Sequence, residues 1–120
     1  MFNFEKLEVW RRAIDFADQI YSVTEGFPDA ERFGLTNQMG RAAVSVSSNI
    51  AEGSFRSSRT DFARLVEIGT GPLFEVDSQA VIARRRSFLP EPSFKGIYEA
   101  AEEECRSFSG LRASLLKSGS

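Results

Sequence analysis

The chain has 120 residues, 42% of them hydrophobic and 27% charged, which fits one globular domain over residues 1–120 and excludes wholesale disorder. The net charge of −2 and the pI of about 5.2 exclude a broad basic surface, so any nucleic-acid site must be a local patch. The single cysteine excludes an internal disulfide, and no apolar run approaches the roughly 20 residues that span a bilayer. Because Met1 to Lys6 show no signal-peptide pattern either, we expect a cytoplasmic protein with no membrane partner.

The first two predicted helices cover residues 4–25 and 30–52. Gly26 and Pro28 end the first, because glycine suits a helix C-terminus and proline cannot continue the helix. We expect Gly53 to end the second in the left-handed conformation. Each helix has apolar residues at steps of three and four, which indicates one buried face. These predicted inner residues are Phe4, Leu7, Trp10, Ile14, Ala17 and Tyr21, then Phe33, Leu35, Met39, Ala42, Ala43, Val46 and Ile50.

The third and fourth predicted helices cover residues 59–89 and 93–116. Ser58 is the expected N-cap of the third. Pro72 lies inside that helix, where proline removes a hydrogen bond and clashes with the preceding turn, so we predict a kink or a break near Gly69 to Pro72. In the fourth helix, Cys105 lies on the apolar stripe and is predicted to be a small buried residue. The glutamates predicted on its outer face are Glu99, Glu102, Glu103 and Glu104.

Four helices of similar length with short connections predict an all-α fold, an antiparallel up-down-up-down four-helix bundle. Several large apolar residues fall outside the predicted inner faces, and such a surplus usually marks an interface. We therefore expect a homo-oligomer. The residues in surplus are Phe2, Phe16, Phe55, Phe74 and Phe88.

Two groups of arginines are candidate contacts for RNA or DNA. Arg41, Arg56 and Arg59 could converge on phosphates, or they could form solvated ion pairs with Glu52 and Asp61. The run Arg84, Arg85 and Arg86 could complement the dipole at a helix C-terminus. Repeated around a ring of identical subunits, the same run could form a basic belt.

A polar motif, Asn49-Ile50-Ala51-Glu52-Gly53, also has two interpretations. It could present Asn49 and Glu52 to a partner, or it could be structural, with Asn49 bonded to backbone or a neighbouring helix and Glu52 paired with Arg56 or Arg41. Trp10 and Tyr21 are predicted to be core or interface anchors rather than base-stacking groups. The candidate polar contacts between helices are Gln38, Glu75 and Gln79.

The sequence contains few side chains that could act in catalysis. The sequence has no histidine, its lone cysteine has no evident base, and it has no Glu-x-x-His pair of the kind that binds two iron ions in helix bundles. We therefore predict a protein that is not an enzyme, with no metal site and no cofactor.

Several segments together resemble one family, the four-helix-bundle proteins encoded in intervening sequences of bacterial large-subunit ribosomal RNA genes. The family includes the accessory variability determinant proteins of diversity-generating retroelements. The resemblance spans roughly residues 4 to 90 and rests on Phe4-x-x-Leu7-x-Val9-Trp10-x-x-Ala13, Phe27-Pro28-x-x-Glu31-x-Phe33-Gly34-Leu35-x-x-Gln38, Arg41-Ala42-Ala43-Val44-Ser45-Val46-x-x-Asn49-Ile50-Ala51-Glu52-Gly53, Arg56-Ser57-Ser58, and Leu73-x-Glu75 with Gln79.

This resemblance implies a helical bundle that assembles into a ring-like homopentamer. It also implies an accessory role, because retroelement members bind a reverse transcriptase and nucleic acid through basic surfaces. The sequence departs from the family pattern at Gly40, where a second basic residue is usual, at Pro72, and in its acidic pI. The two resulting hypotheses are a homo-oligomeric accessory protein that binds RNA or DNA, and a scaffold that binds another protein and no nucleic acid.

Overall fold

The computed structural model describes residues 1–117, so residues 118–120 of the predicted domain lie outside the described part. Its four long helices are α1 (Glu8–Thr24), α2 (Leu35–Phe55), α3 (Arg59–Arg85) and α4 (Glu91–Lys117). Two short 3-10 helices, η1 (Asn3–Lys6) and η2 (Asp29–Glu31), precede α1 and α2. The predicted all-α fold is confirmed.

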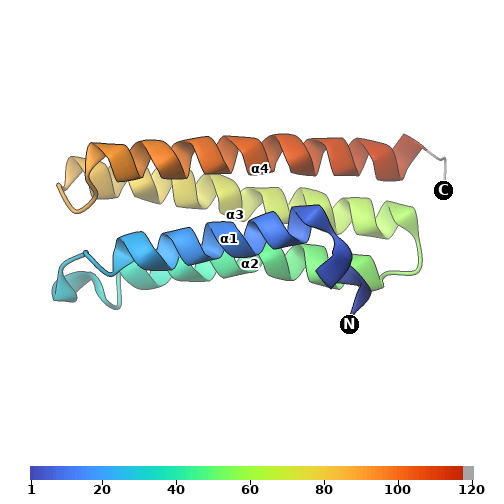
Figure 1. The fold of residues 1–120 in the computed structure, drawn as a ribbon, viewed down its shortest axis with the longest axis horizontal. Helices are drawn as coiled ribbons and strands as arrows, with labels where there is room; N and C mark the ends of the chain where they lie inside the picture. The colour runs from blue at the N-terminus through green and yellow to red at the C-terminus, as the bar shows by residue number, and fades with distance from the viewer. Residues whose placement is uncertain (118–120) are drawn as a thin grey trace.

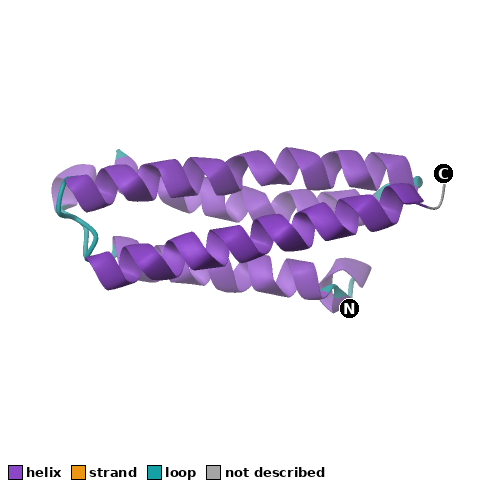
Figure 2. Cartoon of the chain, turned by 90° about the horizontal axis from the view of Figure 1, so that it is seen from above, coloured by secondary structure: helices purple, strands orange, loops and turns teal. Residues whose placement is uncertain are grey.

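The helices alternate in direction and form a bundle of 47 × 24 × 19 Å, with the N-terminus and the end of α4 at the same end of the molecule (Figure 1). Consecutive helices pack side by side, and α4 returns beside α1 (Figure 2). α3 packs extensively against both α2 and α4. The α2–α3 face and the α3–α4 face of the bundle are therefore adjacent, with α3 as their shared edge.

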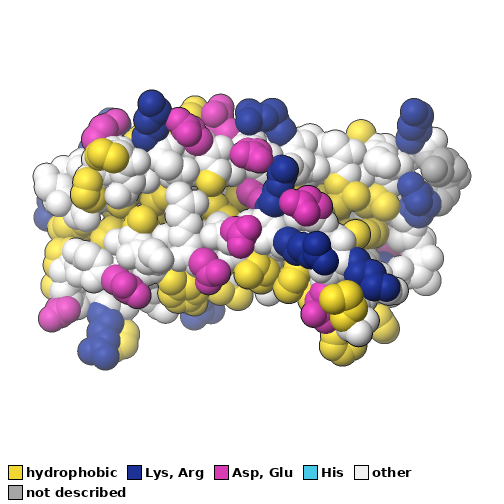
Figure 3. All heavy atoms as spheres, in the orientation of Figure 1, with side chains coloured by type: hydrophobic (Ala, Val, Ile, Leu, Met, Phe, Trp, Pro, Cys, Tyr) yellow, Lys and Arg dark blue, Asp and Glu magenta, His cyan; other side chains and the backbone are white. Residues whose placement is uncertain are grey.

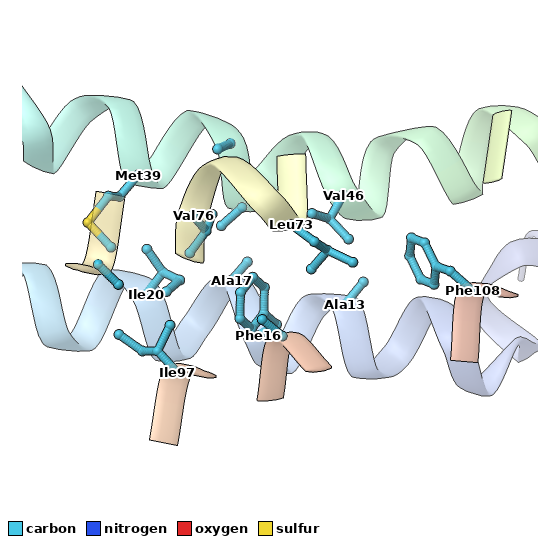
Figure 4. Close-up of a cluster of buried hydrophobic side chains, with 14 of the residues drawn as sticks. Ala13, Phe16, Ala17, Ile20, Met39, Val46, Leu73, Val76, Ile97 and Phe108 are labelled. Carbon is cyan, nitrogen blue, oxygen red and sulfur yellow. The ribbon is translucent and has the colours of Figure 1, made fainter. Parts of the chain in front are cut away.

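All four helices contribute to one apolar core (Figure 4). Two predictions about phenylalanine are wrong. Phe16, predicted in surplus, is only 2% exposed, because the buried face of α1 is centred on Ala13, Ala17 and Ile20. Phe33, predicted inside, is 87% exposed, because it lies in the turn before α2, where helical periodicity does not apply.

The predicted end of the second helix is also wrong. Gly53 lies inside α2, which continues to Phe55, and is not a left-handed cap. A Cβ on Gly53 would lie 2.7 Å from Cδ1 of Phe62 and 3.2 Å from Cβ of Leu65. Glycine is therefore needed here for the close approach of α3, not for the shape of the backbone.

The third helix is continuous through Pro72, so the alternative of a break near Gly69 to Pro72 is excluded (Figure 1). A kink within the unbroken helix stays a prediction. The helix ends at Arg85, four residues before the predicted end, where Ser87 takes a left-handed φ of 65°. The Ser87 and Phe88 N–H groups then donate to the carbonyls of Arg84 and Ala83, at 3.0 and 2.8 Å, which is a Schellman ending.

Candidate functional site

Four of the polar residues selected from the sequence line one groove of about 400 Å³ between α2 and α3. Gln38 and Arg41 come from α2, and Glu75 and Gln79 come from α3. Oε1 of Gln79 is buried and has no hydrogen-bond partner. Arg41 is exposed, and within residues 1–117 its side chain makes no ion pair or hydrogen bond. This α2–α3 groove therefore contains an unused donor and an unused acceptor.

The predicted convergence of Arg41 with Arg56 and Arg59 does not occur. Arg41 lies in the second turn of α2, roughly 20 Å along the helix axis from Arg56. Nη2 of Arg56 pairs with Oε1 of Glu52 at 2.7 Å, so the ion-pair interpretation is confirmed for Arg56.

No pattern in the sequence predicts the contact that Arg59 makes. Its guanidinium donates hydrogen bonds to the backbone carbonyls of Ser114 and Leu115, at 2.9 and 3.1 Å. Arg59 thus binds carbonyls in the last described turn of α4, where an arginine side chain can cap a helix. Its partners are backbone atoms 55 and 56 residues away, which side-chain patterns do not reveal.

Two of the three arginines at the end of α3, Arg84 and Arg86, make contacts with nearby side chains. Arg84 pairs with Glu91 at 3.2 Å, and its guanidinium carbon lies 4.3 Å from the ring centre of Phe94. The Arg86 guanidinium lies 6.0 Å from the ring centre of Phe88. Arg85 is exposed and makes no such contact within the described chain. Basic and acidic side chains are interspersed over the face drawn in Figure 3, without a broad basic area.

The structural interpretation of Asn49 is confirmed, because its Nδ2 donates to the Ser45 carbonyl at 2.8 Å within α2. Trp10 is half-buried and packs edge-on against Phe4, with ring centres 5.0 Å apart. Tyr21 is exposed and lies over Gly40 on the surface between α1 and α2, so it is not part of the core.

The prediction that Glu104 lies on the outer face is wrong. Glu104 is 3% exposed, and with Arg12 and Asp15 it lines a groove of about 160 Å³ between α1 and α4. Oε2 of Glu104 has no hydrogen-bond partner. Burial raises the pKa of Glu104 to about 7, although the nearby Arg12 lowers it. Glu104 follows Ala101 by three residues and precedes Phe108 by four, and this spacing would have placed it on the buried face of the helix.

A third groove, of about 350 Å³, lies between α3 and α4. Phe74 and Tyr98 line it and are 64% and 43% exposed, and Asp77 and Glu102 add two carboxylates. Oδ1 of Asp77 is buried without a hydrogen-bond partner. Burial and, second, the charge of Glu102 raise the pKa of Asp77. Sequence patterns singled out Phe74 as a surplus apolar residue and Glu102 as an outer glutamate, but they did not place either of them in one groove with Asp77.

Cys105 also lines this α3–α4 groove, and it is half-buried rather than fully buried as predicted. Burial, followed by the charge of Glu104, raises the pKa of the Cys105 thiol. A thiol with a raised pKa is a poor nucleophile at neutral pH, so the groove lacks the activation that covalent catalysis requires.

Within residues 1–117, no group of three or more acidic, cysteine or histidine side chains is arranged to hold a metal ion. Among the described helices, none combines the length and the apolar character needed to cross a membrane.

Comparisons with known proteins agree with this fold. A crystal structure from Bacteroides thetaiotaomicron, of a protein with unknown function from the S23 ribosomal protein family, superposes with a TM-score of 0.73. The two sequences are 21% identical, and the match covers 91% of this chain and 98% of the other. A search of curated protein sequences gave no match. The family model described as 23S rRNA-intervening sequence protein matches residues 5–110, well beyond residue 90, where the recognisable motifs end. The chain therefore belongs to the family of 23S rRNA-intervening sequence proteins.

Proposed function

We propose that this protein is a non-catalytic accessory protein that works as an assembly of identical subunits. The observation that carries the proposal is the exposure of large apolar side chains on the bundle surface. Phe55 is 89% exposed and Phe74 is 64% exposed, and Ile68 and Ile82 are exposed along α3. Leaving such side chains in water is costly, and association with another copy removes them from it.

The reactive and ionisable side chains of this protein favour a binding role over a catalytic one. The sequence contains no histidine, and Cys105 has a raised pKa. The ionisable side chains that lie close together in the structure line open grooves on its surface. Open grooves between helices suit contact with another macromolecule better than they suit a reaction that must exclude water.

The family resemblance implies a ring of five subunits. Five chains of 13.4 kDa give an assembly of about 67 kDa with a closed cyclic symmetry.

The proposal is tested by sedimentation velocity on the full chain and on two variants of Phe74. We expect the wild type to sediment as an oligomer. Phe74→Ser should raise the dissociation constant at least about tenfold, whereas Phe74→Leu, which keeps an apolar side chain, should raise it much less. A wild type that remains a monomer at micromolar concentrations would refute the proposal.

A second candidate function is binding of RNA or DNA at the end of the bundle where α3 stops. The supporting observation is that Arg85 is exposed and makes no ion pair within the described chain. In a ring, one such arginine from each subunit would form a repeated basic surface, even though the whole chain is acidic.

This second candidate is tested by fluorescence anisotropy with structured RNA and duplex DNA across a salt series. Binding should weaken linearly in log K against log salt, and Arg85→Glu should weaken it more than Arg64→Glu, a matched change at the far end of α3. Absence of binding at low salt would leave a protein as the partner, which is the scaffold alternative.

A further inference from the structure

The grooves on the two sides of α3 lie at the same level along the bundle. Glu75 and Gln79 line the α2–α3 groove with Arg41, and Asp77 lines the α3–α4 groove. Asp77 is two residues from each of them, so it lies only about 3 Å away along the axis and on the opposite side of α3. Arg41 and Asp77 therefore lie at nearly the same position along the bundle axis, on the adjacent α2–α3 and α3–α4 faces.

The α3–α4 groove has the chemistry of a site for a cation. Its rim holds two exposed aromatic rings, Phe74 and Tyr98, whose faces attract cations. Beside them, Asp77 has a buried oxygen without a partner, and Glu102 adds a second carboxylate. The one cation at this groove, Arg106, makes no ion pair with any described residue. Among the described residues, Asp77 therefore has no cationic partner.

The α2–α3 groove presents the complementary group. Arg41 is exposed and makes no ion pair within residues 1–117, although Glu75 lines the same groove. Planar guanidinium groups bind carboxylates with two parallel hydrogen bonds and stack on aromatic rings, which are the two features that the α3–α4 groove offers.

We propose that Arg41 of one copy enters the α3–α4 groove of the next copy and pairs there with Asp77, between Phe74 and Tyr98. The inference rests on the self-assembly proposed above. A contact between two different faces of the same chain is head-to-tail, and repeating it closes a ring when a whole number of steps completes one turn without a shift along the axis. If the ring axis is parallel to the helices, neighbouring copies are not shifted along them. Residues at one level, such as Arg41 and Asp77, then meet.

The experiment is a charge swap measured by sedimentation velocity on the full chain. We expect Arg41→Asp and Asp77→Arg each to raise the dissociation constant of the assembly at least about tenfold, because each places like charges together. The double variant, Arg41→Asp with Asp77→Arg, restores opposite charges and should return the constant to within about threefold of the wild type.

Two exposed residues without ion pairs provide matched controls. Arg64→Asp and Asp18→Arg change the net charge by the same amounts on α3 and α1, and we expect neither to change the dissociation constant by more than about threefold. Far-ultraviolet circular dichroism checks that every variant folds. If Asp77→Arg does not fold, Asp77→Asn replaces it, with a smaller expected loss of association and no rescue arm.

Cys105 provides an independent readout, since it lines the same groove and is the only thiol. Its reaction with 5,5′-dithiobis(2-nitrobenzoic acid) should be slow in the assembled wild type, faster in each single variant and slow again in the charge swap.

The outcomes separate the two proposals. A monomeric wild type would refute self-assembly and, with it, this contact. An oligomeric wild type whose single variants behave like the controls would refute the contact alone. Single variants that dissociate without rescue by the swap would also refute direct pairing of Arg41 with Asp77.

Discussion

Glu103 and Glu104 are neighbours in the sequence but have different environments. Glu103 is exposed and pairs with Arg12 at 2.9 Å, whereas Glu104 is buried under α1 with one oxygen unpaired. Desolvation favours the neutral acid, which is why the pKa of Glu104 is raised to about 7. At the scale of single residues, packing therefore decides the chemistry of these carboxylates.

The raised pKa of Glu104 predicts how stability depends on pH. Between the ordinary value of 4.5 and about 7, the folded chain keeps a proton that the unfolded chain has lost. The free energy of unfolding should therefore fall as pH rises through this window, by roughly 3 kcal/mol in all. Glu104→Gln should abolish this fall and be more stable than the wild type at pH 8.

Urea denaturation at several pH values between 4.5 and 8 measures this dependence. Glu103→Gln is the control, and it should follow the wild type because its carboxylate is exposed. A Glu104→Gln variant that loses stability with pH as steeply as the wild type would show that another group is responsible.

Gly53 provides a second test at the scale of one residue. Gly53→Ala should lower the free energy of unfolding by about 1–3 kcal/mol, because its Cβ would overlap Phe62 and press on Leu65. Gly110→Ala should instead raise it by up to about 1 kcal/mol, since Gly110 lies in α4 with nothing within 4 Å of the new Cβ. Chemical denaturation of both variants compares them, and equal effects would contradict the close-packing role of Gly53.

At the scale of the helix, local signals predicted the breaks between helices and the start of α3 at residue 59. The starts of α1 and α2 were predicted at residues 4 and 30, but these helices begin at Glu8 and Leu35, because a short 3-10 helix precedes each of them. Pro28 and Pro90 mark connections, and the Ser58 hydroxyl accepts a hydrogen bond from the Asp61 N–H at 3.0 Å, as an N-cap should. The ends of α2 and α3 were predicted less well. Gly53 resembles a cap in sequence but serves packing, and no glycine marks the turn at Ser87.

The left-handed Ser87 predicts a stabilising substitution. Ser87→Gly should raise the free energy of unfolding by about 1 kcal/mol, because glycine adopts a positive φ without the steric cost that a side chain incurs. Ser57→Gly, in the connection between α2 and α3, lacks that benefit and should be neutral or destabilising. Thermal denaturation distinguishes them, and a destabilised Ser87→Gly would contradict the role assigned to this ending.

At the scale of the whole molecule, the apolar periodicity and short connections sufficed to predict the bundle. They did not predict which polar groups meet. Arg41 lies far along α2 from Arg56 and Arg59, which flank the α2–α3 connection, and it shares one groove with Gln79 instead. The α3–α4 groove was missed because Asp77 and Glu102 gain their character only when α3 packs on α4.

The exposed apolar side chains and the two complementary grooves support our proposal that this bundle functions as an assembly of identical copies. Native mass spectrometry of the full-length wild type, at neutral pH and low micromolar concentration, tests it most directly. We predict a single dominant species at a small multiple of 13.4 kDa, with five copies at about 67 kDa as the expected number. A spectrum containing only the 13.4 kDa chain would contradict the claim.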